Sequence, residues 1–186
     1  MKFTFYINNN VSFQCNLECV RCVESNNSGR RCKLKSCIGT PYCWIHLLSV
    51  KHLRIKESGA RDAGKGLHAM SKEHNDNEVV FRAGDIIIEY DGEKVPNDDL
   101  DERYGDYTAP YGLKHGSNVE DGACRRGAGT LANHAPRSRA NARYSFSTRD
   151  KVFRLVATKN IRNNKEIFCF YGTDYHFNEP TSHKTK

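Results

Sequence analysis

The sequence predicts a mostly β domain of the α+β class, preceded by a small cysteine-rich module. Short stretches of alternating or β-branched residues follow one another closely, and few segments have the period of a helix. Six of the eight cysteines fall between Cys15 and Cys43. The 186 residues, 38% of them hydrophobic, suffice for one ordinary domain with a small appendage.

Charge and hydropathy exclude some classes of protein. The formal net charge is +7 and the pI is about 9.0, which favours acidic or polyanionic surroundings such as nucleic acid or nucleosomes. No apolar run approaches the roughly 20 residues that span a bilayer. The N-terminal segment is too short and too polar for a secretory signal. We therefore expect an intracellular protein that makes no membrane contact.

Four side chains in the cysteine-rich segment have the spacing of a structural metal site. They are Cys22, Cys32, Cys43 and His46, separated by nine, ten and two residues. Zinc prefers such a Cys3His set in a closed tetrahedral site, and clustered cysteines in a reducing compartment more often hold metal than form disulfides. A helix beginning at Trp44 would place the last two ligands on one side. We therefore predict one zinc ion in a module of residues 1–50 that needs its metal to fold.

The other cysteines leave alternatives open. Cys15, Cys19 and Cys37 could supply other ligands or part of a second zinc site, for which seven candidate ligands are one too few. Cys124 and Cys169 stand alone in the sequence. We expect both to be buried thiols without a chemical role.

The spacing of the four main ligands resembles the WRC-type Cys3His motif, a small plant nuclear module. The resemblance implies zinc and often DNA binding, although Arg30-Arg31 stands where that family has Trp-Arg. With Lys33 and Lys35, these arginines form a basic patch that would make a weak contact with nucleic acid.

The rest of the chain predicts short strands joined by turns. Residues 53–58 alternate apolar and polar side chains, as a half-buried strand does. Residues 81–93 hold a β-branched run that ends in an Asp-Gly turn, and form the clearest strand. Residues 98–104 predict a short acidic helix or turn. Further strands are predicted at residues 152–158 and within residues 165–175.

Two loops carry groups suited to a ligand. Asn133, His134 and Asn141 lie in a stretch punctuated by Gly and Pro, which is either a surface turn or a ligand site, since such groups need partners when buried. Gly64 and Gly66 either form a turn or let the backbone approach a ligand closely.

Four segments, taken in order, resemble the SET-domain protein lysine methyltransferases. They are Gly64-Lys-Gly66-Leu, Glu89-Tyr90-Asp-Gly-Glu93, Ala132-Asn133-His134 with Asn141, and Lys165-Glu166-Ile with Tyr171-Gly172. The resemblance implies a SET domain at residues 51–178, and we expect a flexible basic tail at residues 179–186. It also implies small curled β-sheets in which the C-terminal segment threads under a loop as a pseudoknot.

The sequence departs from the family pattern in three places. Thr130-Leu-Ala132 replaces the usual Arg-Phe-Ile before Asn-His, and the stretch that follows, up to Asn141, is two residues longer. No cysteine follows Cys169, so the wall that a C-terminal cysteine-rich segment often builds would come from other residues. The candidates are Tyr175, His176 and Phe177.

The resemblance implies S-adenosylmethionine as the cofactor. Gly64, Lys65 and Gly66 would approach it through their backbone, and Asn133 and His134 would hold its amino-acid and adenine ends. Tyr171, the catalytic candidate, matches the tyrosine whose hydroxyl lies near the transferring methyl group. Glu166 would fix a loop by hydrogen bonds rather than act as a base. The channel for the substrate lysine would be lined by Tyr90, Tyr111, Tyr175 and Phe177.

The leading hypothesis is a nuclear lysine methyltransferase that acts on histone tails. A basic tail would meet the acidic side chains of Asp98, Asp99, Asp101, Glu102 and Asp106. Two other hypotheses remain open at this point: a catalytically silent binding module with the SET fold, and a zinc-dependent nucleic-acid-binding protein.

Overall fold

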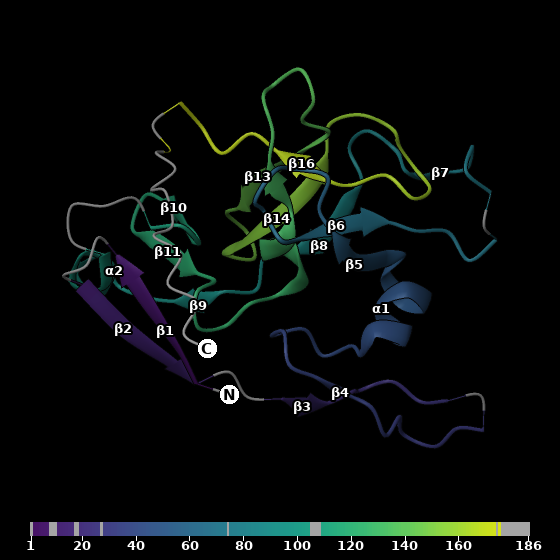
Figure 1. The fold of residues 1–186 in the computed structure, drawn as a ribbon, viewed down its shortest axis with the longest axis horizontal. Coiled ribbons are helices and arrows are strands. Elements are labelled where there is room, and N and C mark those ends of the chain that lie inside the picture. Colours follow the sequence, from purple (N-terminus) through teal and green to yellow (C-terminus); the bar gives the residue numbers. More distant parts are fainter. Residues whose placement is uncertain are drawn as a thin grey trace.

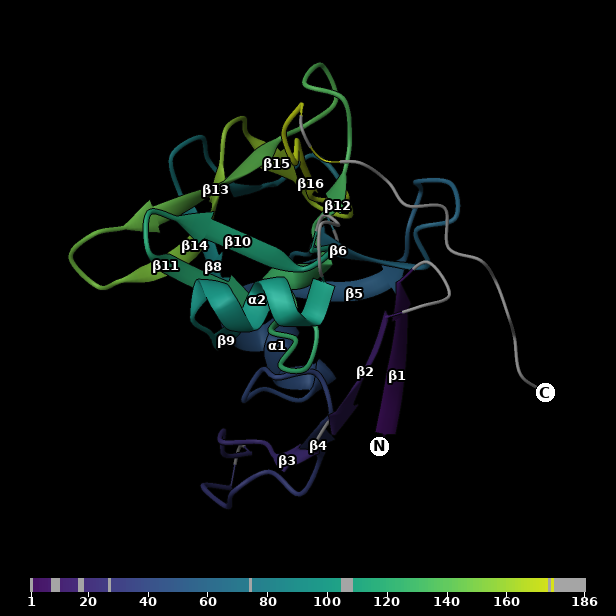
Figure 2. The same ribbon diagram turned by 90° about the vertical axis from the view of Figure 1, so that its left-hand side faces the viewer.

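A five-stranded sheet lies at the centre of the molecule (Figures 1 and 2). The structure is a computed structural model that describes residues 2–7, 11–16, 19–26, 28–73, 75–104, 109–173 and 175. In spatial order the strands are β12 (Asn133–His134), β16 (Phe168–Cys169), β13 (Ala142–Ser147), β14 (Val152–Ala157) and β8 (Ile86–Glu89). Every second residue of β14 is buried, because only one face of this strand meets the core.

Smaller sheets and two helices surround the central sheet (Figures 1 and 2). One sheet has the order β10 (Gly112–His115), β11 (Asn118–Asp121) and β9 (Glu93–Lys94). The paired strands are β5 (Leu53–Glu57) with β6 (Lys65–Ala69), β7 (Val79–Phe81) with β15 (Ile161–Arg162), β3 (Val20–Arg21) with β4 (Lys35–Ser36), and β1 (Lys2–Ile7) with β2 (Val11–Asn16). The helices are α1 (Trp44–Lys51) and α2 (Asn97–Tyr104), and Ala128–Leu131 forms a 3₁₀ helix. Within the described ranges, no helix is long and apolar enough to cross a membrane.

One hydrophobic core joins α1, β5 and β6 to the central sheet. Leu53, Leu67, Leu155 and Ile167 have no exposed surface, and Leu47 of α1 packs against the same cluster. Burying each such side chain contributes about 1.5–3 kcal/mol. The two strands that flank the predicted Gly64–Gly66 turn are thereby held against the sheet that carries Asn133 and His134.

The C-terminal segment threads through the sheet as a pseudoknot. β16 pairs in parallel with both β12 and β13, which are joined to each other by residues 135–141. Asn141 fixes the crossing, since its side chain donates to the Glu166 carbonyl and accepts from the Phe168 N–H, both at 2.9 Å. The mostly β fold predicted from the sequence is confirmed.

The strand predicted at residues 81–93 is interrupted. β7 ends at Phe81 and β8 begins at Ile86, with a turn between them in which Gly84 has a φ of +96°. The Asp85 carboxylate accepts the Arg82 N–H at 2.7 Å and stabilises the turn. The β-branched run forms only β8, because a glycine with positive φ turns the chain away before it.

A buried carboxylate anchors α2. Asp121 of β11 has no exposed surface. It accepts hydrogen bonds from Arg103 at 2.8 Å, from the Tyr104 hydroxyl at 3.0 Å and from the Ala123 N–H at 2.9 Å. Arg103 also donates to Glu93 at 2.8 Å. A buried charge needs such partners, and they hold α2 on the three-stranded sheet.

Replacing Asp121 by Ala should lower the free energy of unfolding by about 3 kcal/mol or more, because Arg103, Tyr104 and Ala123 all lose this buried acceptor. Urea unfolding measures the change. Asp150→Ala is the control, since it removes the exposed pair with Arg154 and should change stability by less than about 1 kcal/mol. Equal losses in both variants would contradict the anchoring role of Asp121.

Candidate active site and metal cluster

Two cavities meet at Tyr171, just after β16. The larger has a volume of about 720 Å³ and the smaller about 240 Å³. Both are lined by Pro110, Tyr111, Thr130, Tyr171 and Tyr175. A molecule in the larger cavity would therefore lie next to any side chain that enters the smaller one.

Four of the six residues predicted to bind a cofactor line the larger cavity. They are Lys65, Asn133, His134 and Tyr171. Gly64 and Gly66 do not line it. Gly64 has a φ of +66°, which suits the turn before β6. A Cβ at Gly66 would lie 2.1 Å from Glu166 Oε1, so a side chain at this position would displace the Glu166 carboxylate.

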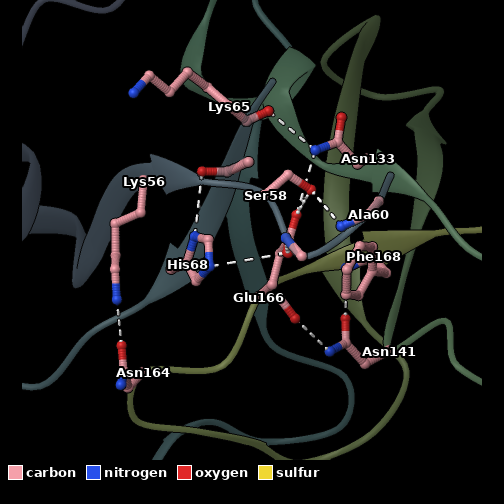
Figure 3. A network of polar contacts seen from close by, with 12 residues as sticks. Lys56, Ser58, Ala60, Lys65, His68, Asn133, Asn141, Asn164, Glu166 and Phe168 are labelled. Carbon is pink, nitrogen blue, oxygen red and sulfur yellow. Dashed lines mark hydrogen bonds and ion pairs between the residues drawn. The ribbon is translucent and has the colours of Figure 1, made fainter. Parts of the chain in front are cut away.

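Glu166 joins the loop after β5 to Asn133 of β12 (Figure 3), and both segments contribute residues to the larger cavity. Its side chain is 7% exposed and accepts hydrogen bonds from the Ser58 hydroxyl at 2.6 Å and the Gly59 N–H at 2.7 Å. Asn133 Nδ2 donates to the same carboxylate at 3.3 Å and to the Lys65 carbonyl at 3.0 Å. Glu166 thus has the loop-fixing contacts expected from the sequence, and Asn133 is held against β6.

His134 connects the Asn-His strand to Tyr171. The Tyr171 N–H donates to His134 Nδ1 at 3.2 Å, and the two rings meet edge to face with centroids 5.4 Å apart. Burial lowers the pKa of His134 below its ordinary value, so the ring is neutral at pH 7 and Nδ1 can accept this hydrogen bond.

Acidification should weaken this contact. Because the pKa of His134 is lowered in the folded state, its contribution to stability is present above about pH 6.5 and is lost as the pH falls through the folded-state pKa. We expect the melting temperature of wild type to fall more than that of His134→Gln between about pH 7 and pH 5. Thermal unfolding across this range checks it, and equal losses in the two proteins would show that His134 is not involved.

The smaller cavity is a cage of tyrosines. Three of the predicted channel residues, Tyr90, Tyr111 and Tyr175, line it together with Tyr144 and Tyr171. Phe177, and His176 beside it, lie outside the described residues. Four of these tyrosine hydroxyls donate to backbone carbonyls: Tyr90 to Tyr111, Tyr144 to Gly129 at 2.9 Å, Tyr171 to Ala132 at 2.8 Å and Tyr175 to Pro110 at 3.3 Å.

Burial raises the pKa of Tyr90, Tyr144 and Tyr171 above the ordinary tyrosine value. Their hydroxyls stay protonated at neutral pH. Each hydroxyl therefore donates its hydrogen to a backbone carbonyl, and only the lone pairs of its oxygen can accept a hydrogen bond from a bound molecule.

Tyr144 and the N-terminal wall of the larger cavity are not predicted from the sequence. Tyr144 lies on β13 in an alternating stretch whose pattern shows a strand but not what the strand faces. Cys37 and Ile38 line the larger cavity although they lie in the cysteine-rich segment. No pattern in the sequence relates these residues to the Asn-His loop.

The four predicted metal ligands come together in a tight cluster. All four ligand atoms of Cys22, Cys32, Cys43 and His46 lie within 4.8 Å of one another. His46 Nδ1 is 3.3 Å from the sulfurs of both Cys22 and Cys43, and the sulfurs of Cys32 and Cys43 are 3.9 Å apart. A tetrahedral zinc ion would separate such ligand atoms by roughly 3.5–3.8 Å, so the donor set fits zinc.

Helix α1 and the surroundings of Cys22 favour metal binding by the cluster. Cys43 is the N-cap of α1, and His46 lies within the first turn. Burial raises the pKa of the Cys22 thiol, but hydrogen bonds from the backbone of Cys43 and Glu24 and from the side chains of His46 and Cys43 outweigh burial and lower that pKa to about 7. A thiolate is the form that binds metal.

The remaining cysteines of the segment lie in disulfides. Cys15 pairs with Cys124 and Cys19 with Cys37, with Cα–Cα distances of 4.9 and 4.0 Å. The expectation of a lone thiol at Cys124 is therefore wrong, because folding brings together residues 109 positions apart. Cys15, Cys19 and Cys37, the alternative ligand candidates, are not part of the four-ligand cluster. Cys169 is a buried free thiol, as expected.

Arg31, a member of the predicted basic patch, forms hydrogen bonds within the cysteine-rich module. Its guanidinium donates to the Cys22 carbonyl at 3.0 Å and to the Arg21 carbonyl at 3.2 Å. Arg21 in turn donates to the Arg31 and Cys32 carbonyls at 2.9 and 2.8 Å. These arginines hold the backbone around the ligands.

Comparison with solved structures shows the same fold in larger proteins. The polycomb repressive complex 2 of Chaetomium thermophilum matches with a TM-score of 0.52 and 22% identity, over 67% of this chain and 16% of that chain. An active polycomb repressive complex 2 in the stimulated state matches at 0.51 and 23%, over 66% and 15%. ctPRC2 in complex with H3K27me3 and H3K27M matches at 0.52 and 20%, over 77% and 16%. No curated protein shows a significant sequence match.

The sequence profile of the SET domain matches residues 78–172, just over half of the chain. The matched part contains β12, β13 and β16, whose threaded arrangement brings Asn133 and His134 to the larger cavity and Tyr171 to both cavities. The SET resemblance predicted from the sequence is thereby confirmed. The chain belongs to the SET-domain family.

Proposed function

We propose that this chain is an S-adenosylmethionine-dependent protein lysine N-methyltransferase that acts on histone tails in the nucleus. The observation that carries the proposal is the meeting of two cavities at Tyr171, one suited to a cofactor and one to a single side chain. A methyl transfer needs its two reactants aligned and close, and adjoining cavities supply that alignment.

The larger cavity fits S-adenosylmethionine. Its volume lies within the range of small-molecule sites, and its walls combine cations with apolar groups. Arg126 would face the carboxylate end, while Leu131 offers apolar surface to the adenine. Asn133 and His134 would supply the polar contacts. When bound, the cofactor supplies a sulfonium methyl group for transfer to a nucleophile.

The smaller cavity favours a neutral lysine amine. Among the described residues, those that line it include no carboxylate and no histidine, while Arg143 adds a positive charge. Both features lower the pKa of an inserted lysine, because burial and a like charge disfavour the ammonium form. Since the Tyr171 hydroxyl proton is held by Ala132, its lone pairs can accept an amine N–H and orient the nitrogen.

A basic peptide matches the surface near this cavity. Leu100 of α2 packs in the same small cluster as Tyr111, which lines the cavity. The exposed acidic side chains of that helix are Asp98, Asp99, Asp101 and Glu102. They would attract a lysine-rich tail. Asp106 lies outside the described residues. The histone-derived ligands named for one similar structure agree with this substrate class.

The proposal includes a structural zinc ion held by Cys22, Cys32, Cys43 and His46. The close approach of four ligand atoms supports it, because three cysteine sulfurs and a histidine nitrogen gathered in one place are a set that zinc binds strongly. The ion would have no part in methyl transfer. It would hold the cysteine-rich segment in its folded form.

The test is incubation of the purified chain with labelled S-adenosylmethionine and an array of histone and non-histone peptides, read by mass spectrometry. We expect methylation confined to lysine, in peptides with basic flanks. Cofactor binding by calorimetry without methylation of any peptide would favour the catalytically silent module. Absence of cofactor binding would overturn the proposal.

A further inference from the structure

The cysteine-rich segment forms part of the wall of the larger cavity. Cys37 and Ile38, just after β4, line it together with Arg126, Leu131 and Tyr171. Figure 1 shows the connection between β4 and α1 reaching from the metal-binding part toward the SET sheets. One wall of the cavity therefore comes from outside the matched SET region.

Direct backbone contact holds this wall in place. A Cβ at Gly39 would lie 2.6 Å from the carbonyl carbon and oxygen of Arg126. The same Cβ would lie 2.9 Å from the Gly127 nitrogen, and Gly127 is itself packed against the Tyr90 carbonyl. The segment thus lies against the SET backbone without an intervening side chain, and a small displacement of Gly39 would move Ile38.

Backbone hydrogen bonds connect the segment to the part of the chain that carries the four-ligand cluster. The Cys22 N–H donates to the Leu34 carbonyl at 2.9 Å just before β4, and the Val23 N–H donates to the Pro41 carbonyl at 3.1 Å. Cys43, a ligand, follows five residues after Ile38. The wall is therefore bounded on both sides by contacts that depend on the folded metal module.

We infer that Ile38 contacts the bound cofactor and that the cysteine-rich module, through Gly39, sets the affinity of the cofactor site. The inference rests on the proposed function, since it takes the larger cavity to hold S-adenosylmethionine. The apolar Ile38 side chain would cover part of the ligand, whose exposed apolar surface gains from burial. The module then serves as a wall of the cofactor site as well as a zinc-binding unit.

The experiment measures the Kd for S-adenosylmethionine by calorimetry, with zinc content determined in the same samples. Ile38→Asn should raise Kd about tenfold, the change that 1.4 kcal/mol produces, while zinc content stays at the wild-type value. Ile38→Val should leave Kd within about twofold of the wild-type value, because the apolar contact is kept. Gly39→Ala should also raise Kd, because its Cβ displaces the wall.

Leu34→Asn is the matched control. Leu34 lies in the same segment, is 39% exposed and does not line the larger cavity, so its Kd should equal that of wild type. If wild type binds the cofactor but Ile38→Asn and Gly39→Ala bind equally well, the inference is overturned and the proposed function stands. If Leu34→Asn weakens binding as much as Ile38→Asn does, direct contact by Ile38 is excluded. Failure of wild type itself to bind would instead reject the proposed function.

Discussion

Replacing Tyr171 by Phe should lower turnover by about two orders of magnitude or more, the scale seen when one oriented polar group is removed from a reacting centre. The ring would keep its contacts with His134 and Tyr175, at centroid distances of 5.4 and 4.9 Å. Only the hydroxyl and its hydrogen bond to Ala132 are lost. Stability should therefore fall by about 1 kcal/mol, and cofactor affinity should stay near the wild-type value.

The fall in turnover is measured by steady-state kinetics, with a peptide that the wild-type protein methylates. A loss confined to KM would indicate uniform substrate binding rather than a role in the transition state. Tyr104→Phe is the control, because it removes a buried hydroxyl from Asp121, outside both cavities, and should change stability without changing kcat. Wild-type turnover in folded Tyr171→Phe would remove the catalytic assignment.

Removal of zinc should unfold the cysteine-rich module. Apparent binding free energies of structural zinc in small modules are about 10–16 kcal/mol, and this energy is also their folding energy. We expect about one zinc per chain, in keeping with the single four-ligand cluster of the described residues. Cys43→Ser should lose the ion and the helical structure of α1, because Cys43 is both ligand and N-cap.

Elemental analysis and circular dichroism of freshly purified protein measure these two losses. Cys19→Ser is the matched control, since Cys19 pairs with Cys37 and lies outside the cluster. It should keep its zinc. Equal loss of zinc in Cys19→Ser would restore Cys19 as a ligand, as one alternative from the sequence allows. Wild-type protein without zinc would refute the metal site.

The strands and helices that the sequence predicts correctly are those that depend on residues close to one another in the chain. The strand at Leu53–Glu57, the helix at Trp44–Lys51 and the acidic helix at Asn97–Tyr104 follow from periodicity and from neighbouring residues. The β-branched strand is shorter than its sequence pattern predicts, because Gly84 adopts a positive φ and the chain turns before β8. That conformation is open to a glycine but is not imposed by it.

The role of Gly66 shows the same division. The sequence indicates that glycine is favoured at this position, and leaves open whether a turn or the close approach of a ligand is the reason. In the structure the reason is Glu166, 100 positions later, whose carboxylate occupies the space of a Cβ. Neither the residue types nor their spacing could identify that partner.

The sequence by itself predicted the SET-domain family, the four side chains that gather in the Cys3His cluster, and Asn133, His134 and Tyr171, which line the larger cavity. These features depend on residue types at short spacings or in a recognisable order. Only the tertiary structure decided that Cys15 meets Cys124, and that Ile38 closes a cavity lined by Asn133. Such contacts join positions about a hundred residues apart, and they arise from the packing of the whole core rather than from any local preference.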